Sequence, residues 1–372
     1  MARSHDIIVI GAGIVGCAIA HELARRGASV QIVDERATGM GATQASAGIL
    51  APYIEAGEGG PLLDLTVRSL HLFDEFMARV TAESGVPVAY QRGGTLQIAF
   101  TIDEMLELRN TAARLEAQGV SAGLVDAQAA RVEEPYLSEG VVGGLVVPTH
   151  GFTAPGDLTR ALVAAARRHG AQVIEGSAVR RIVRATGELI VETDRGSLSG
   201  TAVVLAAGSW SSRVEIEGVS TRAPVRPVRG QLLHLAWKGP VLHRVTWGRG
   251  CYLVPWKDGT LLVGATVEDA GFEERTTVAG VRDLLEAACE LVPHTWTAGF
   301  LGARAGLRPA TSDHLPIIGA SSIVPNLMYA TGHYRNGVLL APLTAQLVAD
   351  AMLDNRVDPA LAALSPGRFG DL

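Results

Sequence analysis

The residues that most clearly indicate chemistry are three glycines and an acid near the N-terminus. The sequence DIIVIGAGIVG places Gly11, Gly13 and Gly16 in a G-x-G-x-x-G pattern, and Asp34 follows it. Gly11 permits a tight turn, Gly13 lets the backbone approach a pyrophosphate at a helix N-terminus, and Gly16 lets helix and strand pack closely. An acid about 20 residues later binds a ribose hydroxyl. The pattern favours binding of FAD or NAD over NADP, and over an ordinary glycine-rich turn.

A second feature is an arginine at the start of a buried segment. The stretch TGHYRNGVLLAP places Arg335 between Gly332 and Gly337, just before an apolar run typical of a buried helix. A charge in that place needs a partner, and the first N–H groups of a helix are unpaired and electropositive. The turn is therefore a candidate anion site, and a solvated arginine in a plain glycine turn is the alternative.

A βαβ unit must position the glycine turn and Asp34. Residues 6–10 and 29–34 are rich in β-branched residues and predict two strands, which flank a helix ending near Arg26. Further helices are predicted at 62–84, 103–118, 155–169, 278–291 and 337–353. Most of the chain between 223 and 302 has strand patterns.

We therefore predict an α/β fold with two discontinuous domains. The expected Rossmann-like dinucleotide-binding domain comprises residues 1–84, 150–222 and 303–372. The expected β-rich (α+β) substrate domain comprises residues 85–149 and 223–302.

Composition excludes several classes of protein. The 372 residues are 48% hydrophobic and 19% charged, with a net charge of −6, which is typical of a globular chain without a nucleic-acid surface. Cys17, Cys251 and Cys289 are far apart and lack zinc-ligand spacing, so we expect a reduced, cytoplasmic protein without a metal site. The longest apolar run is too short to cross a bilayer, so no integral membrane segment is expected.

The sequence resembles the FAD-dependent D-amino-acid oxidase family, and within it the glycine oxidases of thiamine biosynthesis. The likeness is carried, in family order, by GAGIVG with Asp34, ATQASAGIL, AAGSW, CYLVPW, LLVGATVED, AGLRPATSDHLPIIG and GHYRNGVLLAP. It implies an FAD domain, a β-sheet substrate domain and oxidation of a small amine that bears a carboxylate.

The resemblance also implies which residues hold the cofactor. They are Gly11, Gly13, Ile14, Val15 and Gly16 at the pyrophosphate, Asp34 and Glu35 at the adenosine, Val179 at the adenine, Ala42, Thr43, Ala47, Gly48 and Ile49 in a flavin loop, and His333, Tyr334, Arg335, Asn336, Gly337, Val338 and Leu339 in a flavin-binding turn. Gly208 lies in a glycine turn at the end of a strand, which is a further place where the backbone can come close to a bound ligand. Some related sarcosine oxidases attach FAD to a cysteine near GLRP. No cysteine lies near Arg308, so we expect non-covalent FAD.

Arg308 in GLRP matches the arginine that grips the substrate carboxylate, Tyr252 matches the tyrosine that assists it, and Arg335 also faces the substrate. Without the resemblance, Arg308 would be interpreted as an ion-paired arginine and Tyr252 as a core tyrosine. Hydride transfer from the substrate Cα to flavin N5 mainly requires positioning. A neutral substrate amine needs no side-chain base, and we favour a backbone-positioning role for His333 over a role as base. The first N–H groups of the Gly337 helix would stabilise negative charge on the reduced flavin.

The predicted reaction is oxidative deamination of glycine and other small amino acids or amines. O₂ is reduced to H₂O₂, and the imine is hydrolysed to a 2-oxo acid and ammonia. The alternatives are a D-amino-acid dehydrogenase that passes electrons to a quinone or carrier, a sarcosine oxidase, a flavin-binding protein without this catalysis, and an NAD-linked enzyme. Gly250 and Val267 stand where glycine oxidases carry larger side chains, which leaves the substrate open. A homo-oligomer is expected by analogy alone.

Overall fold

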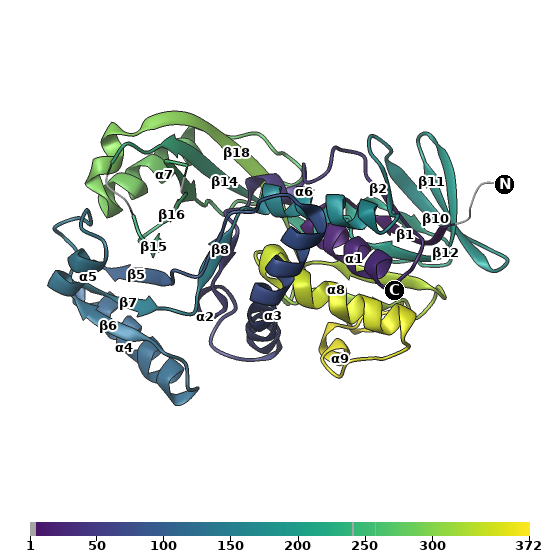
Figure 1. The fold of residues 1–372 in the computed structure, drawn as a ribbon, viewed down its shortest axis with the longest axis horizontal. Helices are drawn as coiled ribbons and strands as arrows, with labels where there is room; N and C mark the ends of the chain where they lie inside the picture. Colours follow the sequence, from purple (N-terminus) through teal and green to yellow (C-terminus); the bar gives the residue numbers. More distant parts are fainter. Residues whose placement is uncertain (1–4, 240–241, 257) are drawn as a thin grey trace.

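The computed structural model describes residues 5–239, 242–256 and 258–372. Two sheets dominate it, and they lie toward opposite ends of the molecule, with helices packed between and around them (Figure 1). The helices are α1 (Ile14–Arg25), α2 (Pro52–Glu55), α3 (Pro61–Ser84), α4 (Ile102–Ala117), α5 (Ala127–Glu133), α6 (Pro155–Arg168), α7 (Val278–Leu291), α8 (Gly337–Leu353) and α9 (Leu361–Leu364).

The first sheet contains the predicted βαβ unit. Its strands run in the order β13 (Glu215–Ile216), β10 (Val179–Ala185), β11 (Glu188–Thr193), β12 (Gly196–Leu205), β1 (His5–Ile10), β2 (Val30–Val33) and β9 (Gln172–Ile174), while β20 (Leu327–Thr331) pairs with β12 and β19 (Ile317–Ala320) with β20. Strand β1 is parallel to both β2 and β12. The carboxyl ends of these strands therefore meet at one edge, where ligands of open α/β sheets bind.

Helices α1, α3, α6 and α8 pack together against this sheet through a shared apolar core. Helix α8 is apolar along most of its length because it is buried within this layer. A short sheet formed by β3 (Ile49–Leu50), β8 (Gly151–Thr153) and β4 (Tyr90–Gln91) joins this layer to the rest of the molecule. The start of α1 and the start of α8 are thus both held by buried apolar side chains.

The second sheet is mostly antiparallel. Its strands run in the order β18 (Gly299–Ala310), β14 (Arg226–Ala236), β17 (Thr260–Gly264), β16 (Tyr252–Pro255), β15 (Val245–Trp247), β5 (Thr95–Ala99), β7 (Gly143–Val147) and β6 (Gly123–Asp126). Strands β18 and β14 pair over most of their length. This pairing places Arg308, near the end of β18, in the same sheet as Tyr252 at the start of β16.

The predicted α/β class and the Rossmann-like βαβ unit are confirmed. The predicted helices at 278–291 and 337–353 agree with α7 and α8, and the other three agree within two residues at each end. The division into two domains stays a prediction, and its boundary at residues 302 and 303 falls inside β18. In the part of the chain that the structure describes, every helix is too short or too polar to traverse a bilayer.

Candidate active site

A cavity opens at the carboxyl edge of the first sheet and reaches the second. Its empty volume is about 1750 Å³, including the space at its mouth. Residues of both sheets form its wall. The predicted site residues on this wall are Gly11, Gly13, Ile14, Val15, Asp34, Glu35, Ala42, Thr43, Ala47, Gly48, Ile49, Val179, Gly208, Tyr252, Arg308, His333, Tyr334, Arg335, Gly337 and Val338.

Three predicted residues lie behind the described wall and support it. A Cβ on Gly16 would collide with the carbonyl oxygen of Gly11, so Gly16 allows the close contact between α1 and the turn. Asn336 is the N-cap of α8, and its carbonyl oxygen accepts a bond from Leu340 N at 2.7 Å. Leu339 is 1% exposed and belongs to the core. These three residues thus shape the turns without facing the cavity.

The glycine turn exposes the start of α1 to the cavity. Gly11 has a φ of +111°, and a Cβ there would collide with the carbonyl oxygen of Ala206. Gly13 is the N-cap of α1 and has no side chain to occupy its first N–H groups. Ile14 N donates to Thr43 Oγ1 at 3.1 Å, which fixes the loop at residues 42–49 beside the turn. This turn fits a pyrophosphate because it brings backbone without side chains, and a helix N-terminus, to the cavity wall.

Asp34 braces the glycine turn. Its Oδ2 accepts a bond from Ala12 N at 2.6 Å, and its Oδ1 accepts one from Arg36 N at 2.7 Å. Burial raises the pKa of the Asp34 carboxyl, although these two N–H groups oppose the shift. Glu35, the next residue, also lines the cavity. Two acids therefore stand at the place expected for the adenosine ribose.

The loop at residues 42–49 packs directly against β18, the strand that carries Arg308. The loop contains the 3-10 helix η1 (Ala42–Ala45), and a Cβ on Gly306 of β18 would lie only 2.8 Å from Ala45 Cβ. Gly48 has a φ of +69°, and a Cβ there would collide with the carbonyl oxygen of Thr153. Small residues are thus required where this loop meets β18 and also where it meets β8.

The turn before α8 is also fixed to β18. Tyr334 has a φ of +48°, and its N–H donates to the carbonyl oxygen of Pro309 at 2.8 Å. Among the described residues, no side chain caps the N-terminus of α8, and Gly337 and Val338 line the cavity. The electropositive start of α8 therefore faces the same space as Arg308.

Arg308 is a partly buried cation without an acidic partner among the described residues. Its Nη1 donates to the carbonyl oxygen of Thr266 at 3.0 Å, and no acidic side chain among the described residues lies within 4.0 Å of its guanidinium. Burial lowers the pKa of Arg308, while Tyr252 opposes that change. A partly buried guanidinium of this kind is a candidate binding group for an anion from outside the chain.

Two glycines leave room for the two side chains that are predicted to bind the substrate, Arg308 and Tyr252. A Cβ on Gly230 of β14 would overlap the guanidinium of Arg308. Gly264 pairs with Tyr252 across the sheet, and a Cβ there would lie 2.5 Å from Tyr252 Oη. Burial raises the pKa of Tyr252 to about 12, so its hydroxyl is a hydrogen-bond donor at neutral pH. Arg308 and Tyr252 thus both lie over glycine on the same sheet.

Glu55 of α2 lies in the cavity wall near these residues, and sequence reasoning missed it. Its Oε1 is 3.9 Å from Arg335 Nη1, and burial raises the pKa of the Glu55 carboxyl while Arg335 and Arg308 oppose that shift. Burial would lower the pKa of Arg335, but Glu55 and Tyr334 outweigh it and raise the pKa. The acid within the stretch APYIEAG was the available signal. Glu55 is thus the acidic partner of Arg335, and among the described residues Arg308 is the cation of this pair without one.

The nucleotide end of the cavity has a cover that sequence reasoning also missed. The guanidinium carbon of Arg36 lies 4.3 Å from the ring centroid of Trp210, and Arg36 Nη2 donates to Glu274 Oε2 at 2.6 Å. The guanidinium carbon of Arg213 lies 3.6 Å from the centroid of the Phe272 ring. Arg36, Trp210 and Arg213 line the cavity. These contacts join the segment after β17 to the first sheet, and no local pattern indicated them.

His333 is held by the helix that follows it. It is 3% exposed, its Nε2 lies 3.1 Å from Thr344 Oγ1, and burial lowers its pKa to about 4. The imidazole is therefore neutral at physiological pH and is hydrogen-bonded to α8. This arrangement supports the interpretation of His333 as a residue that positions the turn.

Replacement of His333 by alanine should leave most of the activity in place. Loss of a general base costs roughly 100- to 10,000-fold in rate, and we expect a much smaller fall in kcat/KM for His333→Ala. Because the pKa of His333 is about 4, the pH profile of kcat/KM near neutrality should keep its shape. Steady-state kinetics on the FAD-loaded variant tests this. A fall in kcat to the level of the free cofactor, with FAD still bound, would contradict it.

Other sequence features lie away from the cavity. As far as the structure describes the chain, Cys17, Cys251 and Cys289 are all absent from the cavity wall. Burial raises the pKa of the Cys17 thiol, and it raises that of Cys251 to about 12. Gly250 and Val267 are also outside the described wall, and Val267 is 55% exposed.

Comparison with known proteins agrees with this geometry. A family model described as FAD dependent oxidoreductase (DAO) matches residues 6–351. The chain is 32% identical to glycine oxidase of Geobacillus kaustophilus over 352 residues, which cover 94% of this chain and 93% of that protein. It also resembles the crystal structure of glycine oxidase from that organism, with a TM-score of 0.93 and 33% identity over 98% of this chain and 99% of the other.

A further relative is the bifunctional protein ThiO/ThiG of Synechocystis sp. It is 35% identical over 376 residues, which cover 99% of this chain and 55% of the relative. The chain thus spans about half the length of that relative. The match to the family model extends across both sheets and includes the whole cavity wall. The chain belongs to the family of FAD-dependent oxidoreductases.

Proposed function

We propose that the chain catalyses the FAD-dependent oxidative deamination of glycine and of similarly small amino acids or amines. One observation carries this proposal: the guanidinium of Arg308 is partly buried at the cavity wall, without an acidic partner among the described residues, over a glycine that makes room for it. A substrate carboxylate is the anion that would complete this site. The names of the glycine oxidases to which the chain is similar support the same substrate.

The residues on the wall fit FAD. The glycine turn and the uncapped start of α1 would hold the pyrophosphate, Glu35 and Asp34 would lie at the ribose, and η1 and the turn before α8 would hold the flavin. When bound, FAD supplies the group that accepts a hydride from the substrate Cα. The protein residues have the task of orientation and electrostatic support.

The chain's own residues divide the substrate contacts between them. Arg308 would bind the carboxylate through paired N–H groups, and the Tyr252 hydroxyl would add a third donor. Arg335 already faces Glu55, which partly balances its charge. The N–H groups at the start of α8 would stabilise negative charge as it develops near them. No step in this arrangement requires a side-chain base, which agrees with the hydrogen bond between His333 and Thr344.

Oxygen as the electron acceptor is part of the proposal. The alternatives, a dehydrogenase that passes electrons to a quinone or carrier and a sarcosine oxidase, would use the same carboxylate contacts. We favour the glycine oxidase because a glycine oxidase of Geobacillus kaustophilus matches the chain over almost the whole length of both proteins.

The test is spectroscopic. The purified protein should show flavin absorption that glycine bleaches without air, faster than sarcosine or D-alanine does. Admission of air should restore the absorption and release one H₂O₂ for each glycine oxidised. A flavin that all three amines leave oxidised would refute the proposal. Bleaching followed by reoxidation only with a quinone would assign the chain to the dehydrogenases.

A further inference from the structure

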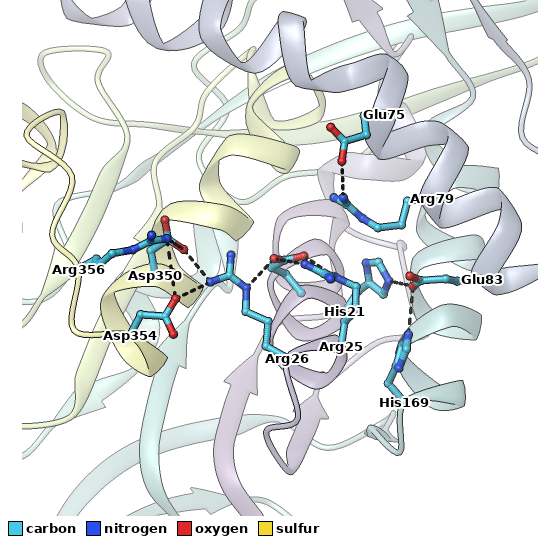
Figure 2. Close-up of polar contacts among 11 residues, drawn as sticks. His21, Arg25, Arg26, Glu75, Arg79, Glu83, His169, Asp350, Asp354 and Arg356 are labelled. Atoms are coloured by element: carbon cyan, nitrogen blue, oxygen red, sulfur yellow. Dashed lines mark hydrogen bonds and ion pairs between the residues drawn. The ribbon is translucent and has the colours of Figure 1, made fainter.

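Two histidines and a glutamate from different helices converge outside the described cavity wall, in the helical layer that packs against the first sheet. His21 lies in α1, Glu83 in α3, and His169 is the residue that caps the C-terminus of α6. Glu83 stands between the two imidazole rings, with its Oε2 2.5 Å from His21 Nε2 and 3.1 Å from His169 Nε2 (Figure 2). The three ligand atoms all lie within 4.8 Å of one another. We propose that this cluster is a binding site for a divalent transition-metal ion, with Zn²⁺ as the best match.

The donor set matches the preferences of zinc. Zn²⁺ binds imidazole nitrogen and carboxylate oxygen at about 2.0–2.2 Å, usually in tetrahedral geometry. Two imidazoles select a transition metal over Mg²⁺ or Ca²⁺, which prefer oxygen ligands. An ion between the three atoms would replace the protons through which the imidazoles now contact Glu83. Only small side-chain movements are needed, because the atoms already point at one place.

Three arginines lie near the cluster, and each has a partner other than the Glu83 carboxylate. Arg25 donates to both oxygens of Glu22, at 3.1 and 2.7 Å, and Arg79 pairs with Glu75 at 3.2 Å (Figure 2). Arg168 Nη1 donates to the main-chain carbonyl oxygen of Glu83. The two ion pairs reduce the repulsion that an incoming cation would meet.

One side of the cluster is open to water. The side chain of His21 is 1% exposed, whereas those of Glu83 and His169 are 25% and 32% exposed. An ion could thus enter beside His169 and keep a water molecule as its fourth ligand. The sequence could not indicate this site, because Glu83 is 62 positions from His21 and 86 from His169.

The site would act on stability and would not take part in the oxidation. His21, Glu83 and His169 are all absent from the described cavity wall. The ion would join α1, α3 and α6, and α1 carries the glycine turn at its other end. Binding to the folded state alone raises the thermal midpoint. We therefore expect zinc to stabilise the FAD-loaded protein while kcat with glycine stays constant.

The experiment uses the full FAD-loaded chain after dialysis against EDTA. Competition with a chromophoric chelator should reveal one tight Zn²⁺ site per chain, and Zn²⁺ should raise the thermal midpoint. Co²⁺ should give ligand-field bands at wavelengths beyond the flavin absorption. His169→Ala, at a partly exposed helix end, should weaken Zn²⁺ binding by at least about 100-fold, since even outer partners of metal ligands contribute 10- to 100-fold.

His71→Ala is the matched control, because His71 is exposed on the same helix as Glu83. It should bind Zn²⁺ as the unaltered chain does. If His169→Ala fails to fold, Glu83→Gln takes its place, because glutamine keeps the shape of the side chain. The Co²⁺ spectrum is measured on the unaltered chain and needs no variant. Equal Zn²⁺ affinity in His169→Ala and the unaltered chain, or the absence of Co²⁺ bands, would overturn the site. Neither result depends on the substrate.

Discussion

Replacement of Arg308 by alanine is expected to lower kcat/KM for glycine by about 100- to 10,000-fold. Two charge-assisted hydrogen bonds contribute about 1.5–3 kcal/mol each, and each 1.36 kcal/mol corresponds to tenfold in rate. Arg308 Nη1 makes its closest hydrogen bond to a backbone carbonyl oxygen, so a substrate carboxylate would be the main partner lost. Steady-state kinetics with glycine, at a known FAD content, measures the effect.

Arg308→Lys separates charge from geometry. Lysine keeps the positive charge but lacks the planar pair of donors, so we expect partial recovery, mainly in KM. FAD absorption should be equal in all three proteins, because the cradle for the pyrophosphate lies at the start of α1. Arg308→Ala with unchanged kcat/KM and full FAD content would show that the substrate carboxylate binds elsewhere, with Arg335 as the next candidate.

The sequence allowed the local parts of this site to be predicted. The glycine turn has three glycines at fixed positions within six residues, and a Cβ at Gly11 or Gly16 would collide with the backbone. The α8 helix was predicted with its observed bounds because its apolar run is preceded by a glycine turn. Short-range patterns of this kind are decided by neighbouring residues, so one sequence is sufficient to identify them.

Contacts between segments that are distant in the sequence could not be predicted from such short-range patterns. Glu55 meets Arg335, and Arg36 meets Glu274, across hundreds of residues. Arg308 and Tyr252 were assigned through family resemblance, since arginines and tyrosines in strands are common. The pairing register of β14 and β18 sets Val228 opposite Arg308 and Gly230 opposite Gly306, so the Arg308 guanidinium reaches over Gly230, and no local pattern specifies this.

Gly230→Ala should therefore impair glycine oxidation even though it adds a single methyl group. The new Cβ would occupy the position of the Arg308 guanidinium. A flexible side-chain end moves more readily than a strand, so the guanidinium should shift and the paired donors should lose their alignment. We expect KM for glycine to rise at least tenfold, a factor that corresponds to about 1.4 kcal/mol. The cost in unfolding free energy should stay within about 1–3 kcal/mol, the usual range for an overpacked core.

A double-mutant cycle shows whether the effect acts through Arg308. If Gly230 only makes room for that guanidinium, Gly230→Ala should cause no further loss in a chain that already carries Arg308→Ala. Gly123→Ala in β6 is the control, because a Cβ there meets no atom within 4 Å. It should leave KM unchanged. Additive losses in the double variant would mean that Gly230 disturbs the sheet itself, and the space over this glycine would then have no specific link to the substrate carboxylate.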